Sequence, residues 1–237
     1  MCGRFAQYCG SMDLEAQFGA SLDGAWPPPR DNIAPGSQLL AVRADSAGTR
    51  TFTTLQWGLI PRWAKDRQIG NRTINARAET VAEKPSFRAA FRQRRCLIPA
   101  DGFYEWQASG SGKQPYFIAR RDRQPFAFAG LWETWTDPAS GARIDSTTII
   151  VTDANDVVRP IHDRMPVILS PSDYRLWLDP GLTRPAPLQP LLRPCDPVPW
   201  MAYPVDRRVN TPAQDDPALI EPCGDLKRDD GGRDQLR

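Results

Sequence analysis

The sequence predicts an α+β fold in which a mainly antiparallel sheet carries the core. Short runs rich in β-branched and aromatic residues predict strands, and amphipathic stretches that predict helices fall between them without a regular βαβ rhythm. The chain has 237 residues, of which 41% are hydrophobic, so it is long enough to bury one sizeable core. No internal repeat is present, and we therefore expect one domain.

The expected elements follow from local composition. Helices are expected at about 11–20 and 86–94, with Ser11 and Ser86 as N-caps, and from Ser170 onward, where a proline suits the first turn. The predicted strands share apolar, β-branched or aromatic side chains and cover 39–43, 51–57, 116–119, 126–131 and 147–151.

The domain is expected to cover residues 1–222. The last stretch, 223–237, is almost entirely charged, polar or Gly, so we expect a disordered tail. Gly and Ser at 109–112 predict a hairpin loop. No run approaches the roughly 20 apolar residues of a membrane helix, and the amino terminus lacks the apolar stretch of a secretory signal. We expect a cytoplasmic protein that does not associate with a membrane.

The cysteines and the single histidine limit the kinds of site that the chain can build. The cysteine count is odd and contains no C-x-x-C pair, which argues against a disulfide framework and a zinc ribbon. The chain has a single histidine, His162, which argues against a metal site with several histidine ligands. We therefore expect neither a metal nor a cofactor.

Positive charge is concentrated in one segment. The net charge is only +2, but residues 62–95 contain ten Lys or Arg against three Asp or Glu, a local charge of +7. An arginine field of this kind suits phosphate groups, because guanidinium forks match phosphate oxygens. The alternative is an ordinary solvated face, in a chain whose codons favour arginine.

Cys2 is the first candidate for chemistry. Removal of Met1, which is usual before a small residue, would leave an α-amine and a thiol on one residue, with ordinary pKa values of about 7.7–8.0 and about 8.5. Such an aminothiol condenses with an aldehyde to a five-membered thiazolidine. Gly3 permits close approach of a ligand, and Arg4 supplies a cation that would lower the thiol pKa. The alternative is a small buried residue.

Three more positions carry groups suited to the same chemistry. His162 lies in a charged loop and can act as a general acid or base, or be merely structural. Glu105 stands among aromatic residues, which would desolvate it and raise its pKa, unless it faces water from an edge strand. The amide of Asn75 can hold a nucleophile or substrate and Arg77 a phosphate, or the pair can form a helix-entry turn.

Six ordered blocks closely resemble the SRAP family, the SOS-response-associated peptidase-like proteins. The resemblance extends from Cys2 to about Pro222 and implies a single SRAP domain: an open, barrel-like β core with flanking helices and a basic groove for single-stranded DNA. The blocks are M-C-G-R-F at 1–5, N-I-A-P-G at 32–36, W-G-L-I-P-R-W at 57–63, I-N-A-R-A-E-T at 74–80, D-G-F-Y-E-W at 101–106 and I-H-D-R-M-P at 161–166.

The resemblance implies covalent capture of abasic sites in single-stranded DNA, by a monomer that acts in the bacterial cytoplasm at damaged nucleoid DNA. Cys2 would trap the aldehyde of the ring-opened sugar as a thiazolidine. Asn75 would position Cys2 and the sugar, and Glu105 would assist proton movement in imine formation and crosslink reversal. His162 would aid ring opening and Schiff-base chemistry.

The same resemblance implies a set of DNA contacts. Arg4, Arg77 and Arg164 match residues that contact phosphates. Pro35 and Trp63 match positions that brace or stack on the DNA at the lesion, a use that suits aromatic platforms. Binding of this kind would be sensitive to salt and largely independent of base sequence.

Three other functions are compatible with parts of the pattern. Amidohydrolases with an amino-terminal nucleophile also begin Met-Cys-Gly and use the freed α-amine as a base. Cys2, His162 and Glu105 can be drawn as a thiol-peptidase triad, which would serve chiefly to remove Met1. A non-enzymatic module could also shield single-stranded DNA by electrostatics alone.

Overall fold

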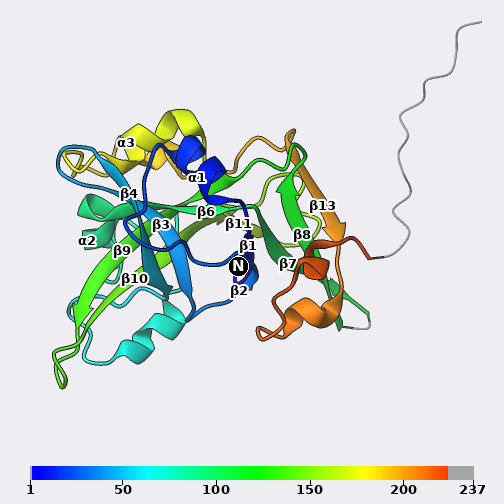
Figure 1. Cartoon of the computed structure of the whole chain (residues 1–237), viewed down its shortest axis with the longest axis horizontal. Helices are drawn as coiled ribbons and strands as arrows, with labels where there is room; N and C mark the ends of the chain where they lie inside the picture. The colour runs from blue at the N-terminus through cyan, green and yellow to red at the C-terminus, as the bar shows by residue number, and fades with distance from the viewer. Residues whose placement is uncertain (1, 111, 224–237) are drawn as a thin grey trace, which may run out of the picture.

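The predicted α+β class, with a mainly antiparallel sheet, is confirmed by the computed structural model, which describes residues 2–110 and 112–223 (Figure 1). Most of the expected disordered tail, from 224 onward, lies outside the described residues. The expected strands all form, and most extend beyond the predicted bounds because pairing with neighbours recruits polar residues at their ends.

Five strands form a closed ring, in the order β10–β4–β3–β6–β9–β10. The ring closes where β4 and β10 pair in parallel, with Ser146 opposite Gln56 and Thr147 opposite Trp57, and its other pairings are antiparallel. The barrel is therefore closed rather than open as expected. Its strands are β3 (Gln38–Ala44), β4 (Arg50–Trp57), β6 (Arg95–Ala100), β9 (Phe126–Thr136) and β10 (Arg143–Asp153).

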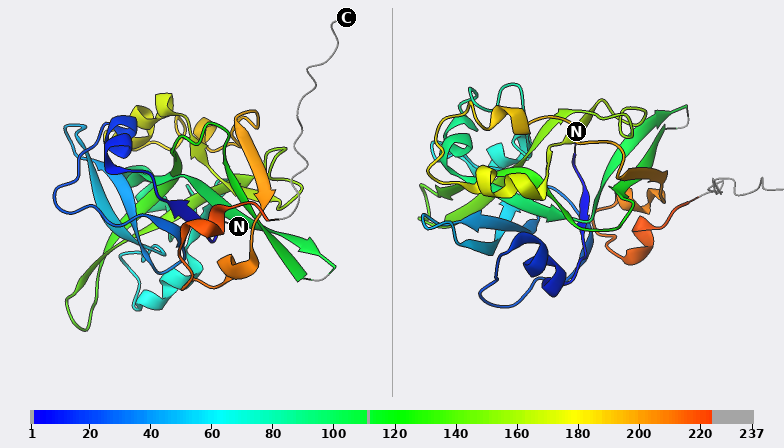
Figure 2. Two further views of the ribbon diagram at one scale, coloured as in Figure 1. Left: turned by 45° about the vertical axis from the view of Figure 1, so that its right-hand side comes forward. Right: turned by 90° about the horizontal axis from the view of Figure 1, so that it is seen from above.

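A second sheet of five strands packs against the barrel, in the order β13–β8–β7–β1–β2. In both Figure 1 and Figure 2, β1 runs through the middle of the molecule, and the long hairpin of β7 and β8 projects from its body. The strands are β1 (Phe5–Gln7), β2 (Arg30–Ile33), β7 (Gly102–Ser109), β8 (Gly112–Arg120) and β13 (Trp200–Pro204). The predicted hairpin loop at 109–112 includes residue 111, which lies outside the described residues; Ser109 and Gly112 pair with each other at the ends of β7 and β8.

Three short strands add to the barrel and bring distant segments beside β10 and β9. They are β5 (Asn75–Arg77), parallel to β10; β11 (Arg164–Pro166), antiparallel to β10; and β12 (Ile168–Leu169), antiparallel to β9. Because β5 and β11 both pair with β10, the segments that carry Asn75 and His162 lie near one another although they are far apart in sequence.

Four barrel strands, β3, β6, β9 and β10, are buried on both faces along much of their length, which explains their nearly continuous buried runs. β4 differs, because its buried residues Phe52, Leu55 and Trp57 are separated by partly or fully exposed ones. Along β3, Leu39 and Ala41 belong to one buried cluster, while Leu40 and Val42 belong to another. The first cluster contains Cys2 and lies between the barrel and the second sheet. The second lies under the helices.

The helices are short and begin differently from the prediction. The N-cap of α1 (Ser11–Phe18) is Gly10 rather than Ser11. The N-cap of α2 (Arg88–Gln93) is Phe87, and Ser86 does not cap it, because the chain enters this helix from a preceding helical turn, in which Arg88 N–H donates to the Lys84 carbonyl.

From Ser170, the expected third helix begins as a 3-10 turn and continues as α3 (Tyr174–Leu178). The 3-10 turns are η1 (Arg67–Arg72), η2 (Pro171–Asp173), η3 (Gln189–Leu191), η4 (Arg207–Asn210) and η5 (Pro217–Ile220).

Candidate active site and nucleic-acid interface

Cys2 immediately precedes β1, and its side chain is fully buried. It belongs to the same apolar cluster as Phe5, Trp57 and Ile149. Burial raises the pKa of the Cys2 thiol above its ordinary range and the carboxylate of Glu105 raises it further, whereas the backbone N–H of Arg4 lowers it. Arg4 thus lowers this pKa, as expected, but through its backbone N–H rather than its cation, and burial outweighs the effect. The thiol is protonated at neutral pH.

Glu105 lies on β7 and is 2% exposed. It is buried as its aromatic sequence neighbours predict, and it does not face water from an edge strand, because β7 pairs with both β1 and β8. Burial raises the pKa of the Glu105 carboxyl, while a coulombic interaction with His162 acts in the opposite direction. Glu105 thus interacts electrostatically with both Cys2 and His162.

His162 follows a helical turn and has a partly buried side chain. Its Nδ1 accepts a hydrogen bond from the Arg164 backbone N–H at 2.9 Å, and Asp163 Oδ1 also lies 2.9 Å from Nδ1. Nδ1 cannot accept from one group and donate to the other at once. In the neutral ring, Nδ1 accepts from Arg164 and the proton is on Nε2; in the charged ring, Nδ1 can donate to Asp163.

The first residues of the turn before His162 are capped by the side chain of Asn155. Asn155 Oδ1 accepts hydrogen bonds from the Val157 and Val158 N–H groups at 3.2 and 3.1 Å. Val158 and Ile161 pack in the cluster that contains Cys2. The apolar side of this turn therefore packs toward the cluster around Cys2. We call the group formed by Cys2, Glu105 and His162 the reactive corner.

Asn75 lies on β5, opposite Ile149 of β10, so the alternative of a helix-entry turn is wrong. Its Nδ2 donates to the Ile74 carbonyl at 3.0 Å, whereas its Oδ1 is buried and has no hydrogen-bond partner among the described residues. Ile74 and Ile149 both pack in the cluster that contains Cys2. Asn75 therefore borders the cluster that contains Cys2, with a buried acceptor available to a donor group.

Arg4 lies inside the fold rather than on its surface. It is 9% exposed, and its Nη1 donates to Asn32 Oδ1 at 2.7 Å and to the Val209 carbonyl at 2.6 Å. These bonds tie β1 to β2 and to the segment that contains η4. Its assignment as a phosphate contact stays a prediction, and the observed contacts give it a structural role as well.

Arg77 and Arg164 lie on β5 and β11, two strands that both pair with β10. Arg77 is exposed. Arg164 forms ion pairs with Glu79 and, at 3.4 Å, with Asp153. Arg77 can thus meet a phosphate directly, whereas Arg164 would have to exchange at least one carboxylate partner to do so.

Pro35 is exposed at the tip of a tight turn between β2 and β3. The Ser37 N–H donates to the Ala34 carbonyl at 3.1 Å, and Gly36 has a φ of 85°, the geometry of a type II turn with Pro second and Gly third. The turn is rigid and places the proline ring at the surface.

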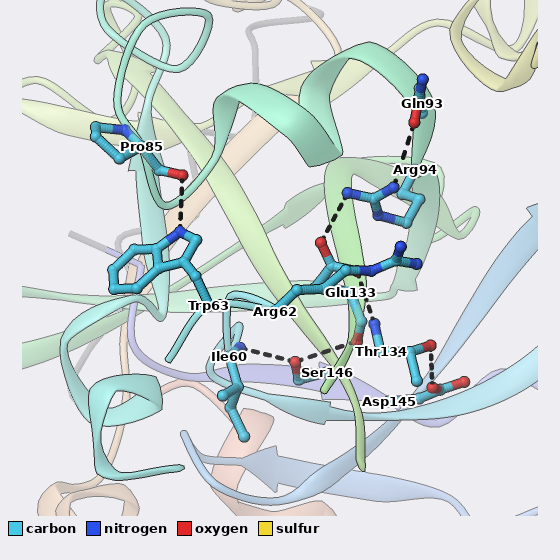
Figure 3. A network of polar contacts seen from close by, with 10 residues as sticks. All are labelled: Ile60, Arg62, Trp63, Pro85, Gln93, Arg94, Glu133, Thr134, Asp145 and Ser146. Carbon is cyan, nitrogen blue, oxygen red and sulfur yellow. Dashed lines mark hydrogen bonds and ion pairs between the residues drawn. The ribbon is translucent and has the colours of Figure 1, made fainter. Parts of the chain in front are cut away.

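Trp63 is 59% exposed, yet the loop that carries it is fastened on several sides (Figure 3). The Trp63 Nε1–H donates to the Pro85 carbonyl at 3.4 Å, and the preceding Arg62 pairs with Glu133 at 2.7 Å. The Ile60 N–H donates to Ser146 Oγ at 2.8 Å. The indole is therefore presented as a fixed, exposed platform.

The basic segment 62–95 divides into two groups in the structure. Arg94 pairs with the buried Glu133 at 2.7 Å, and Arg95 is itself buried. Sequence reasoning did not identify Glu133, because the chain separates it from the segment by some forty residues. The basic residues of the segment that are exposed and have no ion pair among the described residues are Lys65, Arg67, Arg72, Arg77, Lys84, Arg88 and Arg92.

Two hollows in the surface lie away from the reactive corner. One of about 990 Å³ is lined by residues that include Phe126, Tyr174 and Trp200. The other, of about 570 Å³, lies beside Trp63 and Arg72. Neither is lined by Cys2 or Glu105, so size does not identify the site; the arrangement of ionisable groups does.

The described residues contain neither a metal-binding cluster nor a membrane-spanning helix. Within residues 2–110 and 112–223, no three or more His, Cys, Asp and Glu side chains are grouped so that they could hold a metal ion. In the same part of the chain, no helix has the length and apolar character required to cross a membrane.

Comparison with known proteins gives one consistent result. Residues 1–212 match the model of the family described as SOS response associated peptidase (SRAP). A protein of Bacillus subtilis named abasic site processing protein YoqW is 44% identical over 226 residues, which cover 93% of this chain and 99% of that protein. Abasic site processing protein YedK of Escherichia coli is 30% identical, over 94% of this chain and all of the relative.

Solved structures agree with the sequence relatives. A protein from Bacteroides thetaiotaomicron is 28% identical, with a TM-score of 0.84 over 93% of this chain and 99% of its own. A phage-related protein from Bordetella bronchiseptica is 31% identical, with a TM-score of 0.67 over 87% of this chain and 95% of its own. The fold is therefore shared over nearly the whole chain.

Proposed function

Because the chain belongs to the SOS response associated peptidase (SRAP) family, we propose that it processes abasic sites in single-stranded DNA by forming a covalent crosslink through Cys2. The observation that carries this proposal is the reactive corner itself, in which the amino-terminal thiol lies beside a buried carboxyl that also interacts with the single histidine. The names of relatives that match more than nine-tenths of the chain support the choice of abasic sites as the target.

The chemistry requires one condensation and one addition at Cys2. Once Met1 is removed, the α-amine adds to the aldehyde carbon of the ring-opened sugar, and loss of water gives an imine. The sulfur then adds to the carbon of this imine, which is still protonated, while the thiol proton passes to a neighbouring base, and the thiazolidine closes. The net reaction joins aldehyde and aminothiol with release of one water, so it needs no oxidant and no reductant.

Burial suits Glu105 and Cys2 to this sequence. A carboxyl with a raised pKa retains its proton closer to neutral pH, so Glu105 can protonate the hydroxyl that leaves as water and then accept the thiol proton. A protonated Cys2 thiol does not attack first, which leaves the amine to form the imine. His162 would supply a proton at the sugar ring oxygen for ring opening, and the free Oδ1 of Asn75 would accept from the amine.

The opposite order of the same proton transfers reverses the crosslink. Glu105 would protonate the sulfur or return a proton during hydrolysis of the imine. Loss of the 3′ phosphate from the imine stage would give a lyase-like side reaction. Both reactions depend on the same corner.

The test is a denaturing gel after incubation with single-stranded DNA that contains one abasic site. We expect a heat-stable shifted band with the wild type and none with Cys2→Ala. Cys9→Ala is the matched control, because Cys9 lies on the same segment but outside the reactive corner, and it should crosslink normally. Blocking removal of Met1 should also abolish the band. Crosslinking by Cys2→Ala at the wild-type rate would overturn the proposal.

The same preparation distinguishes the other functions. Glutamine hydrolysis that disappears in Cys2→Ala would indicate an amidohydrolase. Cleavage of an unrelated substrate such as casein would indicate a general peptidase, a function that the raised pKa of the Cys2 thiol disfavours because it holds little thiolate at neutral pH. DNA binding without any covalent product would indicate a passive shield.

A further inference from the structure

A chain of side-chain hydrogen bonds connects the β7–β8 hairpin to the turn that carries His162. Tyr116 Oη–H donates to Gln107 Oε1 at 3.2 Å, and Gln107 Nε2–H donates to the Pro160 carbonyl at 2.9 Å. The orientation of the amide is fixed by its partners: a carbonyl can only accept, so the nitrogen must face Pro160, which leaves the oxygen for the tyrosine hydroxyl.

The same face of the hairpin carries Glu105. Gln107 is two residues along β7 from Glu105, and side chains at i and i+2 of a strand point to the same side. Tyr116 is directly opposite Glu105 in the β7–β8 register. At the other end of the bond, Pro160 precedes His162 by two residues. The bond therefore joins the strand that holds the acid to the turn that holds the imidazole.

The turn itself is closed by backbone hydrogen bonds within its own segment. The His162 N–H donates to the Val158 carbonyl at 2.9 Å, and the Ala154 N–H donates to the Asp163 carbonyl at 3.0 Å. These bonds and the cap by Asn155 give the turn its shape. They do not connect it to β7, which is what the Gln107 side chain does.

We infer that Gln107 is a positioning residue, held by Tyr116, which sets the place of His162 relative to Glu105. The inference rests on the proposed function for its kinetic consequence, but not for its structural one. Gln107 is partly exposed, so its loss leaves no buried cavity and the fold should survive. Without it, the turn can shift by a fraction of an ångström, and proton transfer depends steeply on such distances.

Two substitutions test the bond in different ways. Gln107→Ala removes it at every pH. Gln107→Glu keeps the length, but a carboxylate placed against the Pro160 carbonyl is repelled, and the bond returns only when the carboxyl is protonated, below its ordinary pKa of about 4.3. Gln114→Ala is the matched control: it removes a glutamine from the opposite strand that donates to a different carbonyl, that of Val205.

The kinetic readout is the single-turnover rate of crosslinking, with DNA affinity measured separately on a strand that carries a stable, aldehyde-free abasic analogue. We expect Gln107→Ala to lower the rate about tenfold with unchanged Kd, and Gln114→Ala to change neither. The rate of Gln107→Glu, relative to wild type at the same pH, should recover as the pH falls toward 4. An unchanged rate in Gln107→Ala, or a loss confined to Kd, would overturn the inference.

A second readout does not require any crosslinking. His162 is the one histidine of the chain, so its imidazole gives a single set of resonances. We expect Gln107→Ala to shift those resonances, and Gln114→Ala to leave them in place. Unchanged resonances in Gln107→Ala would refute the positioning role even if wild type forms no crosslink, whereas failure of wild type to crosslink, with the resonances shifted, would refute the proposed function alone.

Discussion

The reactive corner and the basic segment 62–95 use ionisable side chains in opposite ways. In the corner, burial raises the pKa of both Cys2 and Glu105, and so favours their neutral forms. In the segment, Arg88 and Arg92 are exposed, but Arg95, a few residues further on, is buried among backbone carbonyls. Residue type therefore does not decide the role of a charged group; its surroundings do. Three variants test this contrast.

The largest effect is expected at Arg95. Its guanidinium donates to four carbonyls, those of Phe91 and Arg92 at the end of α2 and those of Trp177 and Asp179 at the end of α3. Two helix ends, where carbonyls lack partners, are thus held by one side chain. Burial lowers the pKa of Arg95 to about 10, which still leaves it charged at neutral pH.

Arg95→Met keeps the apolar stem but leaves these carbonyls unsatisfied, and we expect the free energy of unfolding to fall by about 3–5 kcal/mol. Chemical denaturation measures it. Arg92→Met is the control, since Arg92 has the same charge on the exposed side of α2 and should change stability by less than about 0.5 kcal/mol. Equal effects of the two substitutions would show that Arg95 is not a structural residue.

Arg95 also shows how far the sequence could predict this molecule. The strands were predictable because apolar, β-branched runs need only local composition to be recognised. The parallel pairing of Gln56 and Trp57 with Ser146 and Thr147, which closes the barrel, was not, because it joins segments some ninety residues apart. Local composition also could not predict which backbone carbonyls surround Arg95.

The residues of the candidate site also differ in whether local sequence could identify them. Cys2, Glu105 and His162 were identifiable because each carries its chemistry in its own side chain and in adjacent residues. The interior position of Arg4, by contrast, depends on Asn32 and on Val209, which is 205 residues away. Gln107 carried no signal at all, since its role comes from its partners and not from an unusual local pattern.

The next effect concerns the buried acid of the corner. In Glu105→Gln, we expect crosslinking to slow by about 100-fold, the usual contribution of a general acid or base. The wild-type rate should fall as the pH rises through the raised pKa of Glu105, because the acid form is lost, and this limb of the pH profile should disappear in Glu105→Gln. Single-turnover rates between pH 4 and 9 measure both features.

Glu105→Gln should slow the reaction but increase the stability of the fold at neutral pH. A carboxyl whose pKa is raised by folding binds more protons in the folded state, so stability declines as the pH rises from the ordinary pKa of Glu to the raised one, and the deficit remains above it. Glu105→Gln should therefore be more stable than wild type at pH 7 and no more stable below about pH 4. A slow variant that is also less stable at pH 7 would indicate that Glu105 supports the fold and not the reaction.

The smallest effect is expected on the exposed side of the basic segment. Arg88 and Arg92 are one turn apart on α2, and Lys84 precedes them by another turn, so the three cations share a face. The row begins beside Trp63, whose indole contacts Pro85. A single strand that stacks on the indole would therefore have phosphates within reach of this row.

Replacing Arg88 and Arg92 together by Gln should weaken binding of single-stranded DNA about fivefold, equally for all base sequences. If each arginine meets one phosphate, the slope of log Kd against log salt should fall by about 1.4, since each contact on a single strand releases about 0.7 of a counterion. The matched pair Arg175→Gln and Arg184→Gln removes the same charge from exposed positions outside the segment and should leave the slope unchanged. If both pairs lower the slope alike, the binding reflects net charge, and the segment's exposed arginines are only a solvated face.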